Sequence, residues 1–223
     1  MEVRKAKPVG GWREFAGQLG VIVVGGAIAL AGWQAVQVLL WRYEVAEARR
    51  SLDRQAAEQL FLASESVALE GCEMRQLDRL SEIVERKDAT PQLRRGVTLR
   101  VHAWNTSPWQ AATAAGVVAH MPLAVRQDYA QHFGLTETMG ALNLQEFTLA
   151  SDLGTLAAPE VLSDTARDRL ASDIARLRGL DRLIATASRQ MVAHLQGMGI
   201  HMQATDAATL KRELAAPCLM PDA

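Results

Sequence analysis

The chain carries a long uninterrupted apolar run near its start. Between residues 15 and 41 there is no Asp, Glu, Lys, Arg or His. As an α-helix, a run of this length spans about 40 Å, which exceeds the roughly 30 Å hydrocarbon core of a bilayer. Trp12 and Trp41 flank the run, as amphipathic rings at two membrane interfaces do. We therefore predict a transmembrane helix over residues 15–41, preceded by a short basic segment over residues 1–14.

The pattern changes after residue 41 to that of an amphipathic helix. Apolar residues now recur at steps of three and four, which predicts that the membrane helix continues outward to about Arg86. A break near Gly71 is the alternative, and residues 87–91 read as a stop that ends in Pro91. The apolar positions of the first part are Val45, Ala48, Leu52, Ala56, Leu60, Ala63 and Val67.

Three start signals divide the rest of the chain into helices. Ser107 followed by Pro108 opens a helix to about residue 120, and Pro122 opens the next, to about residue 156. Ser163 caps a long helix that ends near residue 197, and a short helix follows over residues 205–214.

The helix that follows Ser163 has the strongest periodicity. Its apolar residues fall at strict seven-residue intervals, which is typical of a helix packed in a bundle. We therefore predict an all-α protein in which residues 42–223 form an antiparallel helical bundle with short turns. The residues at these intervals are Leu170, Leu177, Ile184, Met191 and Met198.

Composition and charge narrow the class of protein. Apolar residues make up 49% of the chain and aromatic residues only 5%, which favours helices over a β-sheet protein. The net charge is −1, and no cluster of Lys and Arg suggests a face for nucleic acid. We expect no nucleic-acid partner.

A cleaved signal peptide is the alternative to an uncleaved anchor. Ala29, Leu30 and Ala31 form a small-residue tripeptide of the kind that signal peptidase cuts. The apolar run continues beyond it, however, so cleavage would leave an exposed apolar helix at the new N-terminus. We favour the anchor, and a mature protein that begins at Gly32 would contradict it.

Small residues line one face of the predicted membrane helix. Gly25, Ala29 and Gly32 follow i, i+4, i+7 spacing, which lets two helix backbones approach closely in lipid. The alternative is that small residues are simply frequent in membrane helices. We predict a helix–helix contact at these positions, with a partner protein or a second copy of the chain.

The cysteines bear on orientation, because basic residues flank both ends of the anchor and balance the positive-inside rule. Cys72 and Cys218 are the only two cysteines. In an oxidising compartment a bridge between them would stabilise the domain, whereas in the cytosol they would be free thiols. We favour the bridge, and with it a cytoplasmic N-terminus and a domain outside the cytoplasm.

Motifs for chemistry are missing from the sequence. The five histidines include no His-x-x-x-His pair, and there is no Gly-x-Ser-x-Gly, phosphate-binding loop or dinucleotide-binding motif. We therefore predict no catalytic residue, no cofactor and no metal ion, and we expect that the protein is not an enzyme.

The N-terminal segment WREFAGQLGVIVVGGAIAL resembles a group of uncharacterised bacterial single-pass membrane proteins. The shared features are an acid before the anchor at Glu14, the Val-rich core at residues 21–25, and the exit at Ala29 and Leu30. The segment SPWQAATAAGVVAHMP is similar to a helical segment of the same group. Gly26 and Gly32 depart from the bulkier residues of the pattern. The resemblance implies a bacterial inner-membrane anchor with a helical extracytoplasmic domain, and it carries no catalytic residues.

Together these patterns predict a membrane-anchored helical interaction or accessory protein with most of its chain in the periplasm. Its expected partners are membrane lipid and a protein, or a second copy of the chain. The alternative is a ligand-sensing extracytoplasmic bundle, which a pocket with convergent polar groups would favour. A small hydrophobic pocket beside acids of perturbed pKa would instead favour an enzyme.

Overall fold

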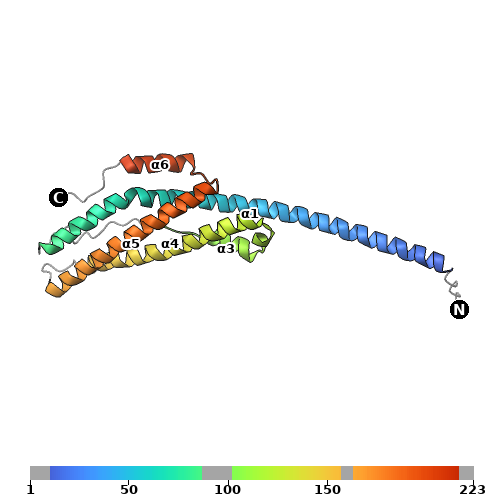
Figure 1. Cartoon of the computed structure of the whole chain (residues 1–223), viewed down its shortest axis with the longest axis horizontal. Helices are drawn as coiled ribbons and strands as arrows, with labels where there is room; N and C mark the ends of the chain where they lie inside the picture. The colour runs from blue at the N-terminus through green and yellow to red at the C-terminus, as the bar shows by residue number, and fades with distance from the viewer. Residues whose placement is uncertain (1–10, 87–101, 157–162, 216–223) are drawn as a thin grey trace, which may run out of the picture. The chain divides into compact units, whose positions relative to one another are not determined.

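A computed structural model describes residues 11–86, 102–156 and 163–215 (Figure 1). All regular structure in these ranges is helical, which confirms the all-α prediction. The elements are the α-helices α1 (Trp12–Glu85), α3 (Ser107–Ala114), α4 (Leu123–Leu156), α5 (Asp164–Gly197) and α6 (Ala204–Ala215), with the 3₁₀-helix η1 (Val117–His120) between α3 and α4.

The chain divides into two compact units, Met1–Glu47 and Ala48–Ala223. The division falls within α1, which is a single helix of 74 residues and continues through Gly71 without a break. In the first unit this helix is long and apolar enough to cross a membrane, and its most apolar stretch is not buried against any other part of the described chain.

In the second unit, α1 and α4 run side by side in the same direction. Tyr129 at the start of α4 donates a hydrogen bond to Asp53. One to two turns further along both helices, Thr136 donates to Gln59 Oε1 over 3.0 Å. Since both partners advance together, the two helices are parallel (Figure 1).

Helix α5 runs antiparallel to the other two and completes the bundle. Arg189 Nη1 lies 2.7 Å from Glu70 Oε2, whereas the earlier Arg178 Nη2 lies 2.6 Å from the later Asp78 Oδ1. The bundle is therefore confirmed, but not every connection is a short turn. Residues 102–106 run back along α1, since His102 lies by Glu65 and Asn105 lies by Gln59.

Local signals define the ends of α5. The Ser163 hydroxyl accepts a hydrogen bond from the Ala166 N–H, which confirms the predicted cap. At the other end, the Ile200 N–H bonds to the Leu195 carbonyl over 3.0 Å. Gly199 has a φ of 78°, a left-handed conformation that glycine adopts without strain, and so the helix stops where the sequence predicts.

The bundle interior holds two apolar clusters instead of one continuous core. The predicted seven-residue repeat of α5 contributes to both, since Leu170, Leu177, Ile184 and Met191 are all buried. Cluster 1 comprises Ala56, Ala57, Leu60, Ala63, Met139, Leu180, Ile184, Ala187, Met191, Leu195 and Ile200. Cluster 2 comprises Leu77, Leu80, Val84, Leu153, Leu170, Ile174 and Leu177.

Candidate functional site

Acidic side chains from all three long helices meet between the two apolar clusters. We call this group the carboxyl layer. Its members are Glu70 and Glu73 on α1, Glu146 on α4 and Asp181 on α5. Glu146 and Asp181 are its most buried members, with only 6% and 3% of their surfaces exposed. Burial of a carboxylate is costly unless it is paired or protonated, so this layer needs a physical explanation.

Glu146 and Asp181 influence each other's protonation. Neither oxygen of Asp181 receives a hydrogen bond from an N–H or O–H group of the described residues, and its neighbour is the Glu146 carboxyl. Burial, followed by the hydrogen bond and charge of Asp181 and the charge of Glu73, raises the pKa of Glu146 to about 8. Glu146 is therefore protonated at neutral pH and can donate to the Asp181 carboxylate.

Burial also raises the pKa of Asp181, with a further contribution from the charge of Glu70. The hydrogen bond from Glu146 acts in the opposite direction and lowers it. Two acids that interact this strongly titrate as one pair, and the first proton they lose belongs to the pair.

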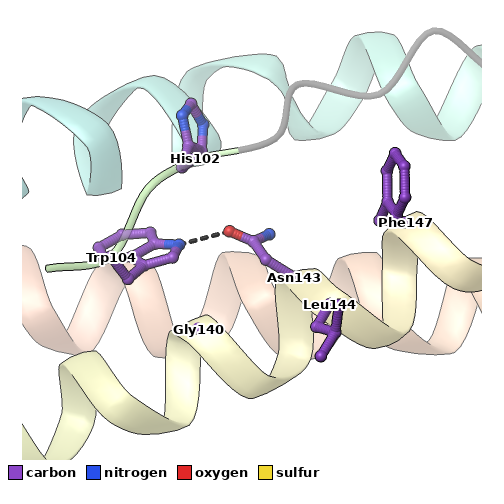
Figure 2. A pocket seen from close by; sticks show the side chains of 6 residues that line it. All are labelled: His102, Trp104, Gly140, Asn143, Leu144 and Phe147. Atoms are coloured by element: carbon purple, nitrogen blue, oxygen red, sulfur yellow. Dashed lines mark hydrogen bonds between the residues drawn. The ribbon is translucent and has the colours of Figure 1, made fainter.

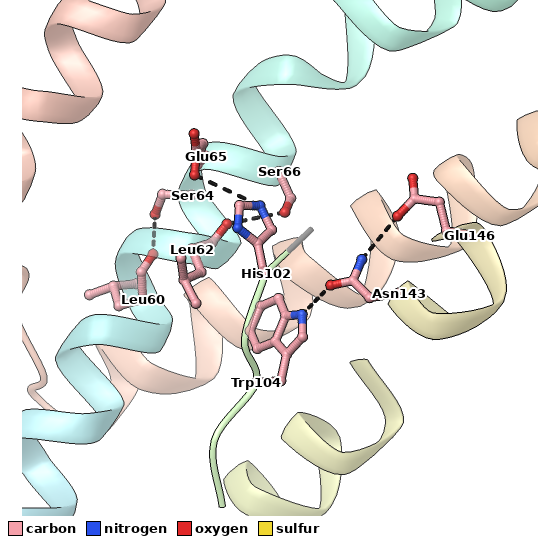
Figure 3. A network of polar contacts seen from close by, with 9 residues as sticks. All are labelled: Leu60, Leu62, Ser64, Glu65, Ser66, His102, Trp104, Asn143 and Glu146. Atoms are coloured by element: carbon pink, nitrogen blue, oxygen red, sulfur yellow. Dashed lines mark hydrogen bonds and ion pairs between the residues drawn. The ribbon is translucent and has the colours of Figure 1, made fainter. Parts of the chain in front are cut away.

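Other polar side chains lie near Glu146 and Asp181 and make hydrogen bonds or charge contacts within or beside the carboxyl layer. The Asn143 Nδ2 donates to Glu146 Oε2 over 3.0 Å, which partly offsets the rise in the pKa of Glu146 (Figure 3). The Arg189 guanidinium contacts Glu70 from the edge of the bundle. Next along α1, Glu65 lies 3.8 Å from the His102 ring, and both side chains are almost fully buried.

A pocket of about 390 Å³ opens beside the layer (Figure 2). Asn143 links the two, because its Oδ1 accepts a hydrogen bond from the Trp104 indole while its Nδ2 reaches Glu146. The pocket is apolar with two polar groups, which suits an aliphatic or aromatic side chain or a small apolar ligand. Its lining residues are His102, Trp104, Gly140, Asn143, Leu144 and Phe147.

The pocket wall that carries His102 and Trp104 is held by Gln59, which is fully buried on α1. Gln59 Nε2 donates to the Asn105 carbonyl over 2.7 Å, and Gln59 Oε1 accepts from Thr136 on α4. One side chain thus ties residues 102–106 to two helices, which explains how a non-helical segment keeps a fixed position over the bundle.

The sequence-predicted anchor residues have no partner among the described residues. Gly25, Ala29 and Gly32 are exposed on α1, and a Cβ at either glycine would meet no atom within 4 Å. The helix–helix contact thus stays a prediction.

Cys72 lies partly buried on α1, with Arg75 Nη2 3.6 Å from its Sγ atom. Cys218 lies outside the described residues, so the disulfide also stays a prediction.

Sequence reasoning missed Trp104, Asn143, Glu146 and Asp181 as site residues. A signal for Asp181 is present in the sequence, because it falls seven residues after Ile174 on a buried line of α5. Glu146 likewise lies seven residues after the buried Met139. Polar residues at core positions of a seven-residue repeat could have indicated the layer.

The described residues include no group of three His, Cys, Asp or Glu side chains placed to hold a metal ion. No known protein family, curated protein or solved structure matches the chain.

Proposed function

We propose that the chain is a membrane-anchored helical interaction protein of a bacterial inner membrane. The observation that carries the proposal is the uncovered apolar surface of α1 in the first unit. Ile22, Ile28 and Leu39 are 70%, 68% and 64% exposed, and the most apolar stretch of the helix is not buried. Transfer of each such side chain from water to lipid is worth about 1.5–3 kcal/mol, so a bilayer is the natural environment of this helix.

The second unit supplies a surface suited to a protein partner. Leu144 and Phe147 are 67% and 54% exposed where they line the pocket beside Trp104. Exposed apolar side chains around an aromatic pocket are typical of interaction sites that receive a side chain of a partner. Within the membrane, the face formed by Gly25, Ala29 and Gly32 offers a second contact, to a partner helix or another copy of the chain.

The proposed topology places the N-terminus in the cytoplasm and residues 42–223 in the periplasm. Basic residues are balanced between the two ends of the anchor, so this orientation rests on the predicted Cys72–Cys218 disulfide, which would need an oxidising compartment. Non-reducing mass spectrometry of the protein from intact cells tests the disulfide, and two free thiols would remove that support.

Membrane fractionation tests the anchor. The full chain should stay in the membrane pellet after alkaline carbonate extraction, and alkaline phosphatase fused at the C-terminus should be active. A soluble product that begins at Gly32 would show cleavage, and an inactive fusion would reverse the topology.

Site-specific photo-crosslinking tests the partner surface. A photoreactive residue at Phe147 should yield a discrete adduct in intact cells, whereas one at the exposed Glu137 on the same helix should not. If the protein with the probe at Phe147 is recovered only as an uncrosslinked monomer, this result would contradict the proposal that the chain is an interaction protein.

A ligand-sensing bundle is the second candidate, because Asn143 and His102 place two polar groups in an apolar pocket. Gly140→Leu would fill this pocket, since even a Cβ at position 140 lies 3.7 Å from the Trp104 Cβ. Native mass spectrometry from mild detergent should then show a bound small molecule in the wild type that Gly140→Leu lacks. Absence of any adduct in the wild type favours the interaction protein.

A further inference from the structure

We propose that a small pocket at the end of α5 binds a free α-amino acid with a short side chain. The pocket has a volume of about 150 Å³ and shares no lining residue with the apolar pocket beside Trp104. It does not depend on the anchor or on the partner surface. Its lining residues are Arg49 and Asp53 on α1, Val125, Asp128 and Tyr129 on α4, and Met198, Gly199 and Ile200 at the end of α5.

Contacts between the three helices fix the walls of this pocket. Tyr129 is only 2% exposed and donates a hydrogen bond to Asp53, which joins α4 to α1. Burial, followed by the hydrogen bond and charge of Asp53, raises the pKa of Tyr129 to about 12, so its hydroxyl remains a donor at neutral pH. The His194 Nε2 lies 3.1 Å from the Asp128 carbonyl oxygen, which joins α5 to α4. The walls are thus in place before a ligand binds, which lowers the cost of binding.

Arg49 supplies the positive charge among the lining residues. The backbone of the opposite wall cannot share this role, because its N–H groups are bonded to carbonyls of α5. These N–H groups belong to Met198, Gly199 and Ile200. A carboxylate in the pocket would therefore be held by the Arg49 guanidinium, whose planar fork of donors matches it with two parallel hydrogen bonds.

Two carboxylates give the same pocket a negative side. Asp53 and Asp128 both line it, and each is half-buried. Asp53 Oδ1 accepts from Tyr129, which leaves Oδ2 as an acceptor for a ligand. Neither Asp128 nor Arg49 forms an ion pair with any of the described residues. An ammonium group at this side would gain charge-assisted hydrogen bonds.

This combination of charges favours a ligand that carries both an ammonium group and a carboxylate. A simple anion would face the two aspartates and a simple cation would face Arg49, so each would meet a like charge. The volume equals that of about five water molecules, which admits a ligand of about five to eight bonded non-hydrogen atoms. Val125, Met198 and Ile200 provide an apolar wall for a short side chain, such as the methyl group of alanine.

Isothermal titration calorimetry of the full chain in detergent micelles tests the ligand with matched probes. L-Alanine should bind with a dissociation constant between roughly 1 µM and 1 mM. Propionate lacks only the ammonium group of alanine, and ethylamine lacks only its carboxylate, so each should bind at least about tenfold more weakly. L-Phenylalanine is too large for the pocket and should not bind. No saturable binding of L-alanine, or equal binding of any other probe, would overturn the proposal.

Two substitutions test whether the binding occurs in this pocket. Arg49→Gln removes the partner of the ligand carboxylate and Asp128→Asn removes a partner of its ammonium group, so each should weaken L-alanine binding at least about tenfold. Arg182→Gln and Asp152→Asn, on exposed residues of α5 and α4, are the matched controls and should bind like the wild type. Wild-type affinity in both Arg49→Gln and Asp128→Asn would overturn the proposal. Melting temperatures without ligand show whether each variant is folded, and if one is not, the other decides.

Discussion

At the scale of single residues, His132 is a buried polar group whose burial is not compensated by hydrogen bonds. Its side chain is fully buried on α4, and neither ring nitrogen has a hydrogen-bond partner among the described residues. Burial, with a smaller contribution from the charge of His194, lowers the pKa of His132 to about 4. The native bundle thus holds a neutral imidazole that the unfolded chain would protonate.

This depressed pKa makes the bundle sensitive to acid. Since unfolded histidine titrates near pH 6.5, stability should fall as the pH drops from about 6.5 to about 4, by on the order of 2–3 kcal/mol. His132→Leu should remove this loss, which chemical denaturation at several pH values would measure as a difference from the wild type. His201→Gln, on an exposed histidine, is the control. Parallel curves for the wild type and His132→Leu would contradict the prediction.

Glu146 acts in the opposite direction, because its folded pKa is raised. Its contribution to stability is complete below about pH 4.5 and is lost as the pH rises to about 8. At pH 8, Glu146→Gln should therefore exceed the wild type in free energy of unfolding by on the order of 2–4 kcal/mol, and the gap should close near pH 5. Urea titrations of both proteins at pH 8 and pH 5 measure this difference in the free energy of unfolding. A constant gap would indicate altered packing, with no role for a proton.

At the scale of elements, two glycines should respond differently to substitution by alanine, because one has a left-handed backbone conformation and the other lies within a helix. Gly199 has a φ of 78° at the end of α5, whereas Gly134 is an exposed residue within α4. Gly199→Ala should destabilise the bundle by about 1 kcal/mol, and Gly134→Ala should stabilise it by up to about 1 kcal/mol. Thermal melts of the two variants test this pair, and the same sign for both would refute it.

Gln59 controls how one segment is held against the helices. Gln59→Ala removes the hydrogen bonds to the Asn105 carbonyl and the Thr136 hydroxyl together with the packing of a fully buried side chain, so it should cost about 1–3 kcal/mol. Hydrogen exchange should rise in residues 102–106 more than in α5. A uniform rise over the whole bundle would show that Gln59 has no specific role in holding this segment.

Most elements could be predicted from the sequence, because their signals are local. Ser163, Gly199 and the repeat from Leu170 to Met191 each act through neighbours within a few residues. The parallel course of α1 and α4 could not, since it depends on contacts such as that of Asp53 with Tyr129 across the fold. Glu146 was missed for a related reason: an acid on a helix is normally solvated, as Glu82 is beside Arg86.

At the scale of the whole molecule, the two units should differ in what they need to remain soluble. The second unit, Ala48–Ala223, contains both apolar clusters, so it should fold without the first. A chain of residues 48–223 should be soluble without detergent and should melt cooperatively, whereas the full chain should require detergent. Size-exclusion chromatography and circular dichroism test this, and aggregation of the shorter chain would contradict it.

The separation of cluster 1 from cluster 2 has a consequence for how the bundle unfolds. The buried residues form two separate groups, with the partly buried Leu149 packed against both, so each cluster can lose much of its native packing while the other keeps it. Native-state hydrogen exchange should then show that the regions around cluster 1 and cluster 2 open separately and with unequal stability, instead of in one global transition. The less stable of these two regions sets the rate at which a protease can first enter the folded domain.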